Sequence, residues 1–150
     1  MTDPMTGLMR DFDALNKRVK YLEALETPFS WTFLAAPLTS VNWDGDAYST
    51  TAKTVIDLSV IFGAPAGIKA ALFYFTVRDS GSAATDTYLI LAPNNTANEG
   101  MTVNPLVIAD RANRGCIVVP CDANGDVYYQ IVASGAATFD VWLQIFGYLL

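Results

Sequence analysis

The chain has 150 residues, of which 52% are hydrophobic and only 16% charged, a composition that excludes an intrinsically disordered protein. Its length suits one globular domain with a short appendage. The formal net charge of −6, without a basic patch, makes nucleic acid or an anionic membrane surface an unfavourable partner.

The chain contains no histidine, which removes the most frequent general base, the most frequent metal ligand and every Ser-His or Cys-His nucleophile. We therefore expect a non-enzymatic protein with no catalytic residue, no bound metal and no cofactor. Catalysis by paired carboxylates is the enzymatic alternative. Cys116 and Cys121 are expected to be free, packed thiols, because their odd spacing along one predicted strand places them on opposite faces.

The first predicted element is a helix within an N-terminal segment, residues 1–27. Asp3 is a good N-cap residue, Pro4 suits the first helical position, and Pro28 disfavours helix at the residue before it. Charged side chains make up nine of the first 26 residues but only 15 of the other 124, so the composition also changes here. A helix of about 23 residues would be about 34 Å long.

Apolar residues recur in this helix at alternating spacings of three and four. They occupy the a and d positions of a heptad repeat: Met5, Leu8, Phe12, Leu15, Val19 and Leu22. A stripe this narrow indicates a coiled-coil seam, whereas a helix that covers a globular core has a wider apolar face. The alternative is a single amphipathic helix packed on its own domain.

The segment Arg18-Val19-Lys20-Tyr21-Leu22-Glu23 resembles the R-h-x-x-h-E motif of short, parallel, three-stranded coiled coils. In the heptad register Arg18 falls at g and Glu23 at e, as that motif requires. The Arg18 guanidinium can then meet Glu23 of a neighbouring chain while its methylene groups cover the seam. We expect a homotrimer, with a dimer as the alternative, since a β-branched a residue with leucine at d also suits two strands.

Residues 28–150 are predicted to form an antiparallel β-sandwich or jelly roll of about eight strands. Short apolar or alternating runs are separated by segments rich in Gly, Asp, Asn and Ser, and no helix-length amphipathic stretch recurs. The candidate strands span residues 30–37, 54–59, 69–78, 87–92, 106–110, 115–120, 127–133 and 138–148. The last of these is apolar at nearly every position, so it needs cover on both faces, which a neighbouring subunit can supply.

Two loops contain residues that are typical of binding sites. Trp43, Asp44 and Asp46 can form part of a sugar or metal site, with the indole stacked on a pyranose ring, although an acidic loop beside a core tryptophan explains them equally well. The segment 122–126 places oxygen ligands at alternate positions, as calcium loops do. Its Asn-Gly pair favours a turn instead, and it lacks the downstream glutamate of a full calcium loop.

A short trimeric coiled coil followed directly by a compact β-sandwich resembles the surface proteins of phage particles: fibre tips, head fibres and decoration proteins. Several segments resemble hypothetical tail-associated proteins of bacterial viruses, among them Trp43-Asp44-Gly45-Asp46 and Leu143-Gln144-Ile145-Phe146-Gly147-Tyr148. The resemblance implies a non-enzymatic structural or attachment role. Its partners would be other copies of the chain, other virion proteins and a host-surface glycan.

The N-terminus lacks the basic-then-apolar order of a secretory signal. We therefore expect a protein that is made in the host cytoplasm and carried on the virion surface. A soluble, trimeric carbohydrate-binding protein is the alternative function, because three weak sugar sites gain avidity from their spacing.

Overall fold

The computed structural model describes residues 4–25, 30–40, 52–84, 86–96 and 99–150. In this part of the chain, a long helix, α1 (Pro4–Leu25), precedes eight strands and one short helix, α2 (Leu58–Phe62). The strands are β1 (Trp31–Thr39), β2 (Thr54–Ile56), β3 (Ala70–Asp79), β4 (Tyr88–Ala92), β5 (Met101–Val103), β6 (Asn113–Pro120), β7 (Val127–Val132) and β8 (Phe139–Leu149).

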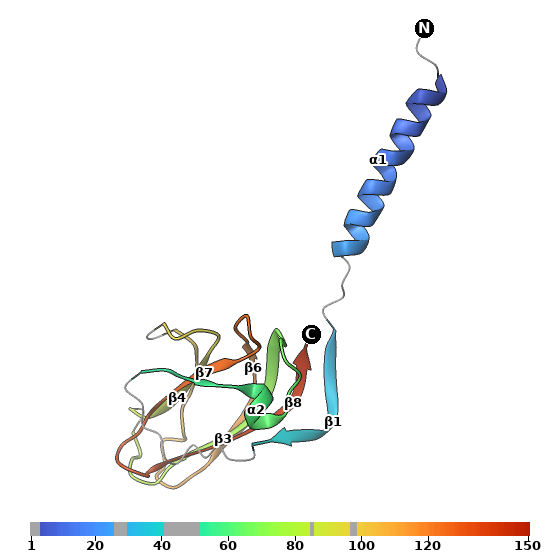
Figure 1. Ribbon diagram of the computed structural model, residues 1–150. Coiled ribbons are helices and arrows are strands. Elements are labelled where there is room, and N and C mark those ends of the chain that lie inside the picture. Colours follow the sequence, from blue (N-terminus) through green and yellow to red (C-terminus); the bar gives the residue numbers. More distant parts are fainter. Residues whose placement is uncertain (1–3, 26–29, 41–51, 85, 97–98) are drawn as a thin grey trace.

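The eight strands form two antiparallel four-stranded sheets (Figure 1). Sheet A has the strand order β1-β8-β3-β6, and sheet B has the order β2-β7-β4-β5. The prediction of a mainly β, antiparallel domain of about eight strands is confirmed. The predicted boundary between residues 27 and 28 lies outside the described residues, between α1 and β1, and it stays a prediction.

The two sheets share one hydrophobic core. Along β3 the buried residues Ala71, Phe73, Phe75 and Val77 alternate with half-buried ones, as expected for a strand with one face inward. Sheet B contributes buried side chains such as Leu89 to the same cluster. Fully burying one such side chain stabilises the fold by about 1.5–3 kcal/mol. Two sheets that share a core in this way fit the predicted β-sandwich.

The predicted strand at 54–59 ends early, at Ile56, because a helix begins directly after it. Asp57 is the N-cap of α2, and its Oδ1 accepts hydrogen bonds from the amides of Ser59 and Val60, each at 3.0 Å. Gly63, with φ of 72°, ends the helix in the left-handed conformation. The local capping residues therefore outweigh the β-branched character of the run.

The prediction of a strand at residues 106–110 is wrong. The fifth strand is β5, and residues 107–110 form bends and a turn in which Asp110 has a φ of 59°. The amide of Asp110 donates a 2.7 Å hydrogen bond to the carbonyl of Asp79, and the Asp110 carboxylate pairs with Arg78. Contacts with the end of β3 thus decide the conformation of an apolar run that locally favours a strand.

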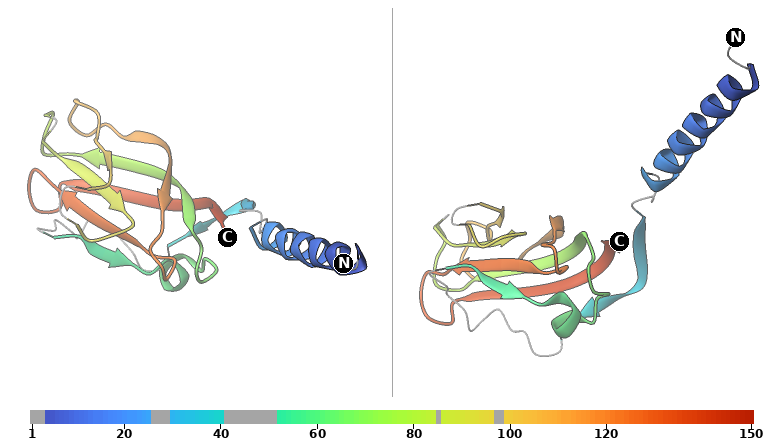
Figure 2. Two further views of the ribbon diagram at one scale, coloured as in Figure 1. Left: turned by 90° about the horizontal axis from the view of Figure 1, so that it is seen from above. Right: turned by 45° about the horizontal axis from the view of Figure 1, so that its top comes forward.

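The start of β1 lies beside the end of β8. Trp31 pairs with Leu149, and the amide of Leu150 donates to the carbonyl of Ser30 at 3.4 Å. We call this the α1 end of sheet A, because β1 is the first strand after α1 (Figure 1). The opposite end, where Asp79 pairs with Phe139, is called the far end. Figure 2 shows α1 clear of the strands in two further views.

Both cysteines are free, as predicted, but only Cys121 is partly buried. Cys116 is exposed on β6, so the prediction is wrong in that this thiol does not pack within its own chain. Burial, together with the neighbouring carboxylates of Asp122 and Asp126, raises the pKa of Cys121 to about 12.

Candidate functional site

All eight residues predicted to mediate trimerisation lie within α1. At the three seam positions whose side chains are described, the residues are exposed: Phe12 at 63%, Leu15 at 57% and Val19 at 43%. Arg18 is exposed as well. This part of the seam is therefore not packed on the sheets of its own chain, and it remains available to other copies.

A second apolar surface is the outer face of sheet A, which points away from the core. It carries one row of cross-strand neighbours from all four strands: Phe33 on β1, Gly147 on β8, Leu72 on β3 and Val118 on β6. The next rows add Tyr74 beside Cys116, and Trp142 beside Thr76. The exposed large hydrophobic residues of this face are Phe33, Val118, Trp142 and Phe146.

A bulge in β8 shapes this face. The register with β3 shifts between the Leu72–Gly147 pair and the Phe73–Ile145 pair, so Phe146 is the extra residue. Its ring meets Tyr74 edge-on, with 5.9 Å between the ring centroids. A side chain at Gly147 would meet the carbonyl oxygen of Thr32 at 2.8 Å, so glycine is what allows β1 to lie this close.

The charged residues within the strands of sheet A are confined to its far end. The strands of sheet A contain four charged residues, two of each sign: Arg78, Asp79, Arg114 and Asp140. All four lie in the last pairs of the register at the far end, since Arg114 pairs with Thr76 and Asp140 with Arg78. The rest of the sheet is uncharged, in a chain that carries a net charge of −6.

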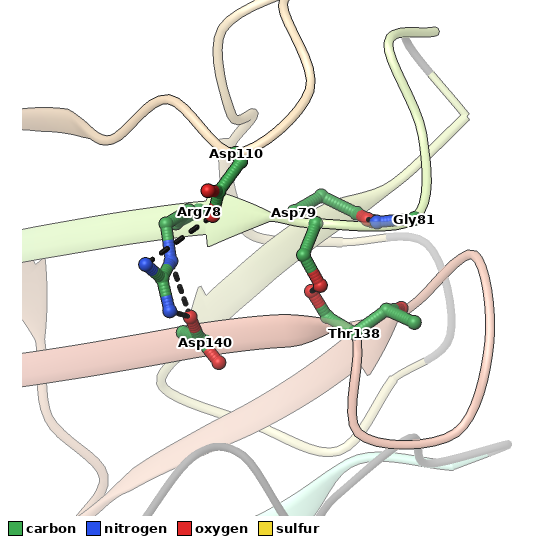
Figure 3. A network of polar contacts seen from close by, with 7 residues as sticks. Arg78, Asp79, Gly81, Asp110, Thr138 and Asp140 are labelled. Carbon is green, nitrogen blue, oxygen red and sulfur yellow. Dashed lines mark hydrogen bonds and ion pairs between the residues drawn. The ribbon is translucent and has the colours of Figure 1, made fainter.

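The far end is organised by Arg78, which reaches between two carboxylates (Figure 3). Its guanidinium pairs with Asp140 on β8 and, at 3.3 Å, with Asp110 in the loop before β6. The same group lies 5.8 Å from the centre of the Trp142 ring. These contacts hold the loop that exposes Leu106, Val107 and Ile108.

Next to this network, Asp79 is buried and holds the turn that follows β3. Its Oδ1 accepts hydrogen bonds from the amides of Gly81 and Ser82, at 2.7 and 3.0 Å, and from the hydroxyl of Ser134 at 2.8 Å. The carboxylate thereby joins the loop after β3 to the loop before β8. These contacts indicate a structural role for Asp79.

The segment 122–126 forms the predicted turn, but it does not join a hairpin. Asp122 Oδ1 accepts hydrogen bonds from the amides of Asn124 and Asp126, at 2.8 and 3.0 Å. The turn carries the chain from β6 in sheet A to β7 in sheet B. Over the described ranges, no group of three or more Asp, Glu, Cys or His side chains is arranged to hold a metal ion.

Trp43, Asp44 and Asp46 lie outside the described residues, so the sugar-binding interpretation of that loop stays a prediction. Among the helices that are described, none is long and apolar enough to cross a membrane.

Sequence reasoning missed the Arg78 network and most of the outer face of sheet A. The Arg78–Asp140 contact joins residues 62 positions apart, and no local pattern marks it. For the outer face a signal exists, because both sets of alternate residues in β8 and in β3 contain large apolar side chains. Only the register shows that these residues form one continuous surface.

Neither a protein-family model nor a curated protein matches this chain.

Proposed function

We propose that the protein is a non-enzymatic homotrimer on the surface of a virus particle, as a fibre, attachment or decoration protein. The observation that carries this proposal is the seam of α1, whose residues Phe12, Leu15 and Val19 are exposed on a helix of 22 residues. Such a helix gains little stability alone in water, and association with copies of itself buries the seam. Arg18 and Glu23 flank the seam at g and e, where charges pair between chains.

The strand order supports the finer assignment of the head as a jelly roll. Consecutive strands alternate between sheets A and B, except for β4 and β5, which are neighbours in sheet B. Eight-stranded, double-sheet jelly rolls are typical of viral capsid and lectin domains. The architecture therefore favours a viral surface protein or a carbohydrate-binding protein, and experiment must separate the two.

Sedimentation equilibrium tests the trimer directly. We expect the full chain to sediment with three times the mass of the 16.2 kDa monomer. Leu15→Asp places a charge in the seam and should shift the protein to monomer. The matched control is Lys17→Asp, at the outward f position, which should remain trimeric. A monomeric wild-type chain at micromolar concentration would overturn the proposal.

The proposed interchain ion pair has its own test. Arg18→Glu or Glu23→Arg alone should raise the trimer dissociation constant, whereas the double swap should restore it. Residues five apart do not face each other on one helix, so rescue can only come from a contact between chains. If the double swap weakens the trimer as much as the single substitutions do, the Arg18–Glu23 pair does not join the chains.

The viral part is tested on intact particles. Antibodies against the β domain should label the surface of particles purified from cells that carry the gene. Absence from such particles would refute the virion assignment and leave the trimer standing. If the protein is absent from particles but the purified trimer binds to a glycan array, the carbohydrate-binding alternative is favoured.

A further inference from the structure

We propose that the outer face of sheet A is the contact between the β domains of the trimer, so that three copies of this face point towards the three-fold axis. This inference rests on the proposed trimer and deepens it, because α1 alone does not require the β domains to touch. The occupant of the face is therefore a second copy of this chain.

The position of the face favours this occupant. Leu25 ends α1 and is five peptide units from Ser30, so these residues lie at most about 18 Å apart. Helices of a coiled coil are about 8–10 Å apart, and three copies of the start of β1 would thus be held near one axis. Trp31 and Phe33 stack on each other at this point, with 6.2 Å between their ring centroids.

The chemistry of the face favours the same occupant. Its exposed residues are large and apolar, whereas an isolated soluble domain rarely leaves a continuous patch of this kind in water. Two copies of an acidic chain repel each other unless their contact avoids carboxylates. The strands of sheet A meet this condition over most of their length, because their two acidic residues, Asp79 and Asp140, both lie at the far end, where Arg78 pairs with Asp140.

The face also has the residue types that dominate subunit contacts. Tyrosine, tryptophan and phenylalanine are enriched where subunits meet, and charged residues are depleted from the centre of such contacts. Tyr74 and Phe146 form an edge-on aromatic pair at the middle of the sheet, and Trp142 lies towards the far end. These three side chains would supply much of the buried apolar area.

Cys116 provides a built-in probe of this contact. It is exposed on β6 and pairs in register with Tyr74, so a buried face would cover its thiol. The other cysteine, Cys121, is partly buried, and its raised pKa keeps it protonated near neutral pH. The Cys121→Ser chain leaves one thiol, and a maleimide of moderate size can report its accessibility.

The experiment compares maleimide labelling of Cys116 in the full chain with labelling in the Leu15→Asp chain, both carrying Cys121→Ser. We expect labelling to be about tenfold slower in the trimer than in the monomer. A trimer whose Cys116 reacts as fast as that of the monomer would overturn this inference and leave the coiled coil intact. A wild-type monomer would instead overturn the proposed function.

A matched pair of valines gives a second readout. Val118 is 41% exposed on the outer face of sheet A, and Val55 is 47% exposed on β2 of sheet B. Val118→Glu should raise the trimer dissociation constant about tenfold or more, which corresponds to about 1.4 kcal/mol. Val55→Glu should leave it unchanged. Circular dichroism checks that both variant chains are folded. If they are, equal effects of the two substitutions on the dissociation constant would contradict the proposed contact.

Discussion

Gly125 shows how one residue can connect two loops of the fold. It has a φ of 92°, and a Cβ at this position would lie 2.7 Å from the backbone nitrogen of Gly67. That approach allows the amide of Gly67 to donate a 3.1 Å hydrogen bond to the carbonyl of Asn124. The Asn-Gly pair in the sequence predicts a turn, but it does not reveal that a second loop packs against that turn.

Gly125→Ala should therefore cost more than an ordinary substitution at a left-handed position. We expect a loss of about 3 kcal/mol in the free energy of unfolding, because backbone strain and a backbone clash add. The matched control is Gly63→Ala, at a φ of 72° with no atom within 4 Å of the new Cβ, which should cost about 1 kcal/mol. Urea denaturation at one protein concentration measures both, and equal losses would contradict the clash.

At the scale of single elements, α2 is held by two carboxylates, Asp57 and Asp126, whose pKa values are shifted in opposite directions. Asp57 accepts hydrogen bonds from the hydroxyl and amide of Ser59 and from the amide of Val60, and these lower its pKa. Asp126 accepts a 3.1 Å hydrogen bond from the amide of Leu58. Burial, and the charges of Asp57 and Asp122, nevertheless raise the pKa of Asp126.

The two shifts predict opposite effects of the same substitution. A lowered pKa means that ionised Asp57 stabilises the fold above its unfolded pKa of about 3.9, and that this stability is lost as the pH falls through the folded value. A raised pKa means that Asp126 contributes stability at low pH, which is lost as the pH rises through its folded value. At pH about 7, Asp57→Asn should thus destabilise the protein, whereas Asp126→Asn should be neutral or stabilising.

Thermal unfolding of the two variants at several pH values measures this difference. Asparagine keeps an acceptor oxygen at each position, so the comparison isolates the charge. The difference between the two variants should shrink as the pH falls through the lowered pKa of Asp57, below which both wild-type carboxylates are protonated. A difference that does not change with pH would show that the hydrogen bonds alone, rather than the charges, separate the two residues.

At the scale of the whole molecule, β1 is the strand of sheet A that follows α1 in the chain, so the two proposed contact surfaces are neighbours in the sequence. The proposed trimer would join three chains through both surfaces and so link folding to association, which makes the melting temperature depend on protein concentration. A tenfold dilution should lower the free energy of unfolding by about 1 kcal/mol per chain, and thus the Tm by about 2–4 °C. The Leu15→Asp chain should show no such dependence, and a wild-type Tm that is independent of concentration would argue against linked trimerisation.

The sequence by itself determined the division between a charged helical segment and an apolar β domain. Pro4 and Pro28 bracket the helix, and the observed α1 ends at Leu25, within the predicted range. Six of the eight predicted strands lie within two residues of observed ones at both ends, because alternation and turn residues are local properties. The heptad positions of α1 are likewise readable from spacing alone.

Only the tertiary structure decided the features that depend on distant pairs. The apolar run 106–108 favours a strand locally, but contacts of Asp110 with Arg78 and Asp79 hold it as a loop. The outer face of sheet A exists because β1, β8, β3 and β6 are neighbours, an order that no local pattern encodes. Sheet register is set by long-range packing, so the surface it creates becomes visible only after the strands are placed.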